Sequence, residues 1–209
     1  DITGQIYCLN DRANSTGDAG DNLGRLAYQE QALTIRRREL PADHPDLAIG
    51  LNNTAEALML VGRLDQARSL AEEAVAISEK VNGPEHGNTG YFLNTLSEIQ
   101  RRDGELEAAD RGTARALPLC EKLFGPSSTL VSEVLSTRAQ VERDLGRLAD
   151  SEATFRNLFK ILDDTSREGG PTRLAAALRE YDVLLKKLGR TQDANEVEVR
   201  IRSLQVGKS

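Results

Sequence analysis

The sequence is poor in aromatic residues and contains no tryptophan. Its 209 residues include only four Tyr and four Phe, too few for the aromatic surfaces on which single-stranded nucleic acids stack. Basic residues do not predominate either, since 27 Lys and Arg stand against 33 Asp and Glu, for a formal net charge of −6. Because nucleic-acid binding depends on neutralising phosphates, this balance argues against a DNA- or RNA-binding protein.

Cysteine and long apolar runs are equally scarce. Cys8 and Cys120 form neither a disulfide framework nor a metal-binding pair. No run of 18 apolar residues is present, so we expect no membrane-spanning helix and no membrane partner. The start, Asp1-Ile2-Thr3-Gly4, does not resemble a signal peptide and suggests a cut or processed end. These features favour a cytoplasmic protein, and 39% apolar residues are enough for a buried core.

The sequence repeats itself with a period of 42 residues. Glycine marks the period at 20, 62, 104 and 146, and again at 189 after one additional residue. Ala32, Ala74 and Ala116 keep the same spacing, as do the histidines His44 and His86. The extra residue fits an insertion in the glycine-containing stretch 163–171. Several landmarks that share one period indicate a repeat architecture.

Each period reads as a pair of helices. Leu47, Leu51, Ala55 and Leu58 lie on one face of a helix that begins at Pro45 and ends at a capping glycine. The spacing predicts ten helices and essentially no strand, with the first helix short because 14–20 is loop-like, and with a kink at Pro118 in the sixth. The expected helices are 3–14, 22–39, 45–61, 64–81, 87–103, 106–123, 128–145, 148–164, 171–188 and 191–206.

The pattern Leu51, Ala55, Gly62, Ala67 and Ala74 resembles a tetratricopeptide (TPR) repeat. The 42-residue period, with 43–48 (DHPDLA) followed by 51–53 (LNN), is similar to the kinesin-light-chain type of this repeat. The resemblance implies an all-α solenoid, a right-handed superhelix of about five helix–turn–helix repeats. These repeats form a single domain over 1–209, at about 1–40, 44–82, 86–124, 128–165 and 171–206, with the first and last atypical or capping.

The resemblance further implies a concave groove lined by the first helix of each pair. Asn52 and Asn94 are related by the period, and kinesin-light-chain-like grooves are implied to use asparagine to clamp an extended peptide. Alternatively, both are simply solvated polar residues. Tyr91, with Met59 and Ile49, either forms a small apolar pocket or is covered by neighbouring helices. The predicted peptide-binding residues are Asn52, Asn94, Glu56, Tyr91, Arg101, Gln140, Arg143 and Arg179.

Arginines and a lysine make the second half of this groove more basic. Arg101, Arg143, Arg179 and Lys186 suit an acidic peptide, although Glu98, Glu133 and Glu180 partly cancel their charge. A run of charge on a solvated helix face is the simpler alternative. His44 and His86 each precede a new helix, which favours a capping or packing role over metal binding.

No sequence feature indicates an enzyme. The nucleotide-binding, zinc-protease and hydrolase motifs are missing, and the paired carboxylates 72–73 and 163–164 fall on helix faces or ends. We therefore expect no catalytic residue, no metal and no cofactor. The leading hypothesis is a non-catalytic adaptor or scaffold that binds a protein or peptide in its groove, as a monomer or weak homo-oligomer. The alternatives are a self-assembling structural module and a docking or sensing segment of a longer signalling protein.

Overall fold

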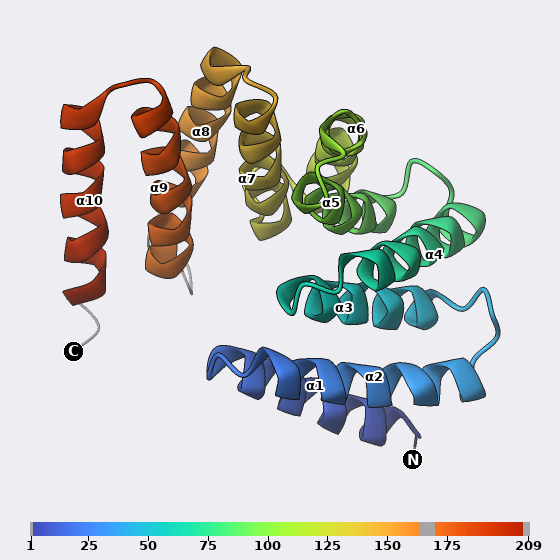
Figure 1. The fold of residues 1–209 in the computed structure, drawn as a ribbon. Helices are drawn as coiled ribbons and strands as arrows, with labels where there is room; N and C mark the ends of the chain where they lie inside the picture. The colour runs from blue at the N-terminus through green and yellow to red at the C-terminus, as the bar shows by residue number, and fades with distance from the viewer. Residues whose placement is uncertain (1, 164–169, 207–209) are drawn as a thin grey trace. The chain divides into compact units, whose positions relative to one another are not determined.

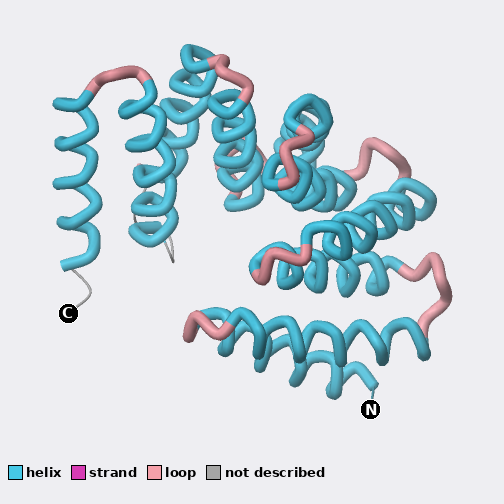
Figure 2. The backbone as a smooth tube through the Cα atoms, viewed as in Figure 1, coloured by secondary structure: helices cyan, strands magenta, loops and turns pink. Residues whose placement is uncertain are grey.

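The computed structural model describes residues 2–163 and 170–206, and every regular element in those ranges is a helix (Figure 2). The predicted all-α class is therefore confirmed. None of the helices in these ranges is long and apolar enough to cross a membrane. The elements are α1 (Ile2–Asp18), α2 (Asn22–Glu39), α3 (Pro45–Leu60), α4 (Leu64–Asn82), α5 (Gly87–Arg102), α6 (Leu106–Phe124), α7 (Thr129–Asp144), α8 (Leu148–Leu162), α9 (Gly170–Lys187) and α10 (Thr191–Val206).

The first helix is longer than the sequence suggested. The prediction of a loop over 14–20 is wrong, because α1 continues to Asp18. Within this stretch the Thr16 hydroxyl donates to the carbonyls of Arg12 and Ala13, at 3.0 and 2.9 Å, so its polar side chain is satisfied without leaving the helix. The expected insertion near 163–171 lies largely outside the described residues. In α6, the helix continues past Pro118 to Phe124.

A side-chain cap precedes α3, α5 and α7, each the first helix of its pair. The His44 Nδ1 accepts a hydrogen bond from the Asp46 N–H at 3.1 Å, and the His86 Nδ1 accepts one from the Asn88 N–H at 3.2 Å. At the equivalent place before α7, the Ser128 hydroxyl accepts from the Val131 N–H at 3.3 Å. The capping role expected for both histidines is confirmed, since an N-cap acceptor satisfies a helix N–H that has no partner within the helix.

Glycine ends the first helix of each pair. Gly62 has φ +79°, a left-handed conformation that other residues rarely adopt. It reverses the chain so that the Arg63 N–H bonds to the Leu58 carbonyl at 3.0 Å, which satisfies a carbonyl in the last turn of α3. The glycines at 20, 104, 146 and 189 also have positive φ.

Alanine residues line the contacts between neighbouring helices, and we call these positions the alanine seam. Ala55 in α3 and Ala67, Ala71 and Ala74 in α4 have no exposed surface. Ala55, Ala67 and Ala71 belong to one cluster with Leu26, Leu58 and Ile99, which come from α2, α3 and α5. A helix pair therefore buries its apolar face only when its neighbours are present, as expected for a repeat protein.

The chain divides into two compact units, Asp1–Leu119 and Cys120–Ser209. Within the first, α1 packs on α2 and α3 on α4, while α2 contacts α3 and α4 contacts α5 (Figure 1). Within the second, α7 packs on α8 and α9 on α10, with α8 against α9. The boundary falls inside α6, directly after the turn that contains Pro118.

The alanine seam predicts a steric effect on stability. Replacing Ala67 with Leu adds a bulky side chain to a position without exposed surface, so we expect the free energy of unfolding to fall by about 1–3 kcal/mol. Urea denaturation followed by circular dichroism measures it. Ala76→Leu is the matched control, because Ala76 lies on the exposed face of the same helix and its change should stay within about 0.5 kcal/mol. Equal losses in both variants would contradict the close approach of helices at Ala67.

Candidate interaction surfaces

The carboxylate of Glu56 joins three helices of the first unit. Its Oε1 accepts hydrogen bonds from the Asn52 amide at 3.0 Å, the Tyr91 hydroxyl at 2.8 Å and the Thr95 hydroxyl at 3.3 Å. Its Oε2 pairs with an Arg25 guanidinium nitrogen at 3.4 Å. We call these five residues the Glu56 network. It brings together three of the predicted groove residues, Asn52, Glu56 and Tyr91, on α3 and α5.

Asn52 lies deeper than a groove-lining residue was expected to lie. Its side chain has no exposed surface. Because its amide nitrogen donates to Glu56, its Oδ1 must face the other way, and that oxygen has no hydrogen-bond partner. A ligand can contact Asn52 only after a neighbouring side chain moves. The clamp role of Asn52 therefore stays a prediction.

The same unpaired oxygen recurs at the 42-residue period. The Oδ1 atoms of Asn10, Asn52 and Asn94 are all buried and all lack a hydrogen-bond partner. We call these three residues the asparagine ladder, and they lie at equivalent places on α1, α3 and α5. Asn10 was not among the predicted groove residues, although it lies one 42-residue period before Asn52. A buried acceptor without a partner costs about 1–3 kcal/mol, so three of them at one repeat position call for an explanation.

Glu98 occupies the position of Glu56 in the next repeat, but its partners are different. It forms a two-pronged pair with Arg101, with both nitrogen–oxygen distances 2.9 Å, and a further hydrogen bond with Arg102 at 2.7 Å. Burial acts to raise the pKa of Glu98, and the hydrogen bonds and charges of the two arginines outweigh it, so the pKa lies below its usual value. Arg101 is therefore already neutralised within its own helix.

The predicted residues of the second unit are also largely engaged. Arg143 is only 7% exposed and pairs with Asp144 at 3.0 Å and with Glu180 at 2.9 Å. Gln140 donates to the carbonyl and hydroxyl of Ser136, both at 3.3 Å, and Arg179 is exposed. Lys186, the fourth cation named for an acidic ligand, pairs with Asp182 and Glu198. Three of the four cations that favoured an acidic peptide thus already have carboxylate partners, which weakens that idea.

The suggested apolar pocket around Tyr91 is partly explained by other contacts. Met59 packs against the buried cluster of the first unit, while the Tyr91 hydroxyl belongs to the Glu56 network. Ile49 remains 40% exposed. Met59 thus fits the alternative in which neighbouring helices cover the side chain, whereas Ile49 does not.

Arg36 is a buried cation that the sequence did not reveal. Only 5% of the residue is exposed, and its Nε and Nη1 have no hydrogen-bond partner. Burial lowers its pKa, and the charge of Asp46 partly opposes this effect. Gly50 on α3 provides the space, because a Cβ there would lie 2.6 Å from the Arg36 Cδ. The sequence analysis gave 22–39 only as an expected helix, and nothing in it singled out Arg36.

Among the residues described, no group of His, Cys, Asp or Glu could hold a metal ion. The two cysteines differ in their environment. Cys8 is exposed and Cys120 is fully buried. Burial, together with the charges of Glu133 and Glu121, raises the pKa of the Cys120 thiol to about 11.

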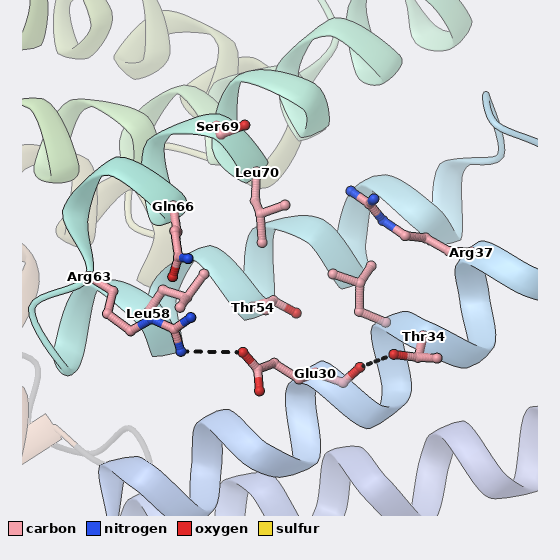
Figure 3. A pocket seen from close by; sticks show the side chains of 10 residues that line it. Glu30, Thr34, Arg37, Thr54, Leu58, Arg63, Gln66, Ser69 and Leu70 are labelled. Atoms are coloured by element: carbon pink, nitrogen blue, oxygen red, sulfur yellow. Dashed lines mark hydrogen bonds and ion pairs between the residues drawn. The ribbon is translucent and has the colours of Figure 1, made fainter.

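A separate pocket lies between α2 and α4 in the first unit, with α3 as its floor (Figure 3). It has a volume of about 560 Å³. Leu33, Leu58 and Leu70 supply its apolar surface, and Arg63 reaches across its mouth to Glu30 at 3.5 Å. None of the predicted groove residues lines it.

Comparison with known proteins identifies the family. Two tetratricopeptide-repeat family models match residues 6–46 and 46–111, which together span half of the chain. The chain belongs to the tetratricopeptide-repeat family. Comparison with curated proteins finds no match.

Solved structures share the fold of this chain, and some of them have TPR-like repeats of kinesin light chain. One is a putative kinesin light chain of Podosopora anserina with nearly identical TPR-like repeats. Its sequence is 20% identical to this chain, its TM-score is 0.73, and the match covers 99% of this chain and 97% of that chain. BtubC (BKLC) from P. vanneervenii is also 20% identical, with a TM-score of 0.76 and coverage of 99% and 82%. A Rap protein complexed with competence and sporulation factor is 13% identical, with a TM-score of 0.79 and coverage of 97% and 54%. The predicted family and its all-α repeat fold are confirmed.

The environment of Glu98 predicts a pH-dependent stability difference. A carboxyl whose pKa is lowered by folding stabilises the protein above its unfolded pKa of about 4.3, and this contribution disappears as the pH falls through the folded value. Glu98→Gln should therefore lower the free energy of unfolding by about 1–3 kcal/mol at neutral pH. The difference from wild type should shrink as Glu98 becomes protonated in acid. Urea denaturation at a series of pH values measures it, and a gap that stays constant down to pH values of about 3 would refute the assignment.

The two thiols should react at very different rates. Because the thiolate is the reactive form, burial and the raised pKa protect Cys120, whereas Cys8 is open to solvent. Iodoacetamide at mildly alkaline pH should alkylate Cys8 in the folded protein and Cys120 only after denaturant is added. Peptide mass spectrometry locates the modification. Early labelling of Cys120 in native buffer would show that its helix opens readily.

Proposed function

We propose that this chain is a non-catalytic scaffold that binds an extended segment of a partner protein against α1, α3 and α5. Proteins with the TPR fold are typically interaction scaffolds. The observation that most strongly supports the proposal is the asparagine ladder. Asn10, Asn52 and Asn94 repeat with the fold and each holds a buried oxygen without a partner. An extended peptide backbone offers repeated N–H donors that could supply such partners.

The ladder oxygens accept no hydrogen bond within the fold, which supports a role in binding. The amide nitrogen of Asn52 donates one hydrogen bond to Glu56. None of the three ladder oxygens accepts a hydrogen bond that would stabilise a contact between helices. A site that carries unsatisfied groups sacrifices stability, as binding sites commonly do. A Rap protein with a similar fold was solved in complex with competence and sporulation factor, which supports a partner-binding role for this fold.

Binding requires local rearrangement in this proposal. Glu56 holds Asn52 and Tyr91 together, so an incoming backbone would displace at least one of the contacts in the Glu56 network. Gln140, Arg143 and Arg179 lie in the second unit and stay separate predictions, and since Arg143 is already paired we do not require an acidic ligand.

The proposal predicts opposite effects on stability and binding. The double variant Asn10→Ala, Asn94→Ala removes two unpaired acceptors. Its free energy of unfolding should therefore be no lower than that of the wild type, and it should be higher by at most about 3 kcal/mol per site. Peptides selected from a displayed random library on the wild-type protein should bind this variant at least about tenfold more weakly, a loss of about 1.4 kcal/mol. Fluorescence anisotropy measures affinity, and thermal unfolding measures stability.

A matched control keeps this experiment specific. Asn195→Ala changes an exposed asparagine on α10 and should leave the affinity unchanged. Undiminished binding to the ladder variant would refute the proposed site.

Self-assembly, docking within a longer signalling protein and cytoplasmic location remain predictions. Light scattering across a concentration series distinguishes self-assembly from a monomer.

A further inference from the structure

Apolar side chains recur beside the asparagine ladder. Tyr7, Ile49 and Tyr91 are spaced by the 42-residue period, and each lies three residues before a ladder asparagine on α1, α3 and α5. Three residues turn a helix by about 300°, so the two positions lie about 60° apart on one face and about 4.5 Å apart along the axis. We call these three residues the apolar column. A backbone that contacts the ladder therefore passes within reach of the column.

The column is accessible to a partner, whereas the ladder oxygens are buried. Tyr7 is 75% exposed and Ile49 is 40% exposed. Tyr91 is half-buried, with its ring centroid 5.5 Å from that of Phe92 and its hydroxyl bonded to Glu56 at 2.8 Å. An exposed tyrosine offers a large apolar area and loses little conformational freedom when a partner covers it, so tyrosine is enriched at protein interfaces. The site thus combines accessible apolar surface with acceptors that lie deeper.

The column and the ladder end at the same repeat. At the corresponding places α7 carries Glu133 and Ser136. After one inserted residue, α9 carries Ala176 and Arg179 there. Neither an asparagine nor a large apolar side chain therefore continues into the fourth and fifth repeats. Two features that share both their period and their extent are what a single binding site requires.

The charges beside the column already neutralise one another. Glu56 on α3 pairs with Arg25 at 3.4 Å, and Glu98 on α5 pairs with Arg101 at 2.9 Å. On α1 the same repeat position carries the neutral residue Asn14. A charged side chain in a partner would have to break one of these pairs to gain a counter-charge of its own. An uncharged apolar side chain is buried against the column without breaking any of them.

We infer that the segment bound at the ladder is uncharged and carries apolar side chains that pack on Tyr7, Ile49 and the ring of Tyr91. This inference rests on the proposed function, because the ladder brings the backbone of the segment to the column. The ladder recognises backbone N–H groups, which nearly every residue offers, whereas the column distinguishes one side chain from another. Tyr7, which was not among the predicted groove residues, is the most exposed of the three.

The test uses blocked peptides that repeat Ser-Ser-X four times, with X as Leu, Ser, Glu or Lys. Every third residue of an extended chain recurs at about 9 Å, which is close to the spacing of about 8–10 Å between packed helices. Each peptide is titrated into protein with labelled isoleucine methyl groups. The Leu peptide should shift the Ile49 signal saturably, with a dissociation constant at or below about 0.1 mM, and at least about tenfold below those of the other three peptides. The signal of Ile201 on α10 should not move.

A double variant removes the exposed part of the column. Tyr7→Ser, Ile49→Ser should bind the Leu peptide at least about tenfold more weakly and the Ser peptide like wild type. The side-chain amide signal of Asn52, present in every variant, reports binding. Both replaced side chains are exposed, so circular dichroism should show an unchanged helix content. Val81→Ser is the matched control, because Val81 is 43% exposed on α4 outside the column, and it should bind the Leu peptide like wild type.

Three results would overturn the inference. They are the lack of a saturable shift with the Leu peptide, equal affinity for the Glu or the Lys peptide, and undiminished binding of the Leu peptide to the column variant.

The ladder variant Asn10→Ala, Asn94→Ala separates this failure from failure of the proposed function. If library-selected peptides lose affinity for the ladder variant but not for the column variant, the ladder site stands and the column inference fails. If the Leu peptide loses affinity for the column variant but not for the ladder variant, the ladder is refuted and the column alone recognises the segment.

Discussion

The close approach of helices at alanine positions is the constraint on which the rest of the structure depends. Ala55, Ala67 and Ala74 have no exposed surface, and a larger side chain at any of them would separate two backbones. At one departure from alanine, the facing residue compensates. Ser97 replaces Ala55 one period later, and it faces Gly112, where even a Cβ would lie 2.1 Å from the serine hydroxyl. The serine hydroxyl in turn donates to the Leu93 carbonyl at 2.7 Å.

This packing leaves α3 with two faces of different character. One face carries Asn52 and Glu56, whose contacts are polar and reach α2 and α5. The opposite face carries Thr54 and Leu58, which form the floor of the pocket between α2 and α4. The two faces of this helix therefore differ in the contacts they make, one through hydrogen bonds and the other through apolar packing. Repeat proteins commonly gain such separate surfaces because each helix contacts only its neighbours.

The sequence predicted the helices because their signals are local and repeated. The apolar spacing, the glycine at 62 and its equivalents and the capping residues at 44, 86 and 128 each mark a boundary within a few residues. It failed at 14–20, where composition suggested a loop although Thr16 bonds within the helix. The site was harder, since burial depends on neighbouring repeats. Nothing local shows that Asn52 is covered, that Arg143 already has partners, or that Arg36 lies over Gly50.

The capping residues differ in chemistry between the two units. His44 and His86, which cap α3 and α5, both belong to the unit Asp1–Leu119. Ser128, which caps α7 in the other unit, accepts through a hydroxyl that can rotate. A neutral imidazole that accepts at Nδ1 carries its proton on Nε2, so each histidine cap selects one tautomer of its ring, whereas the serine cap imposes no such choice.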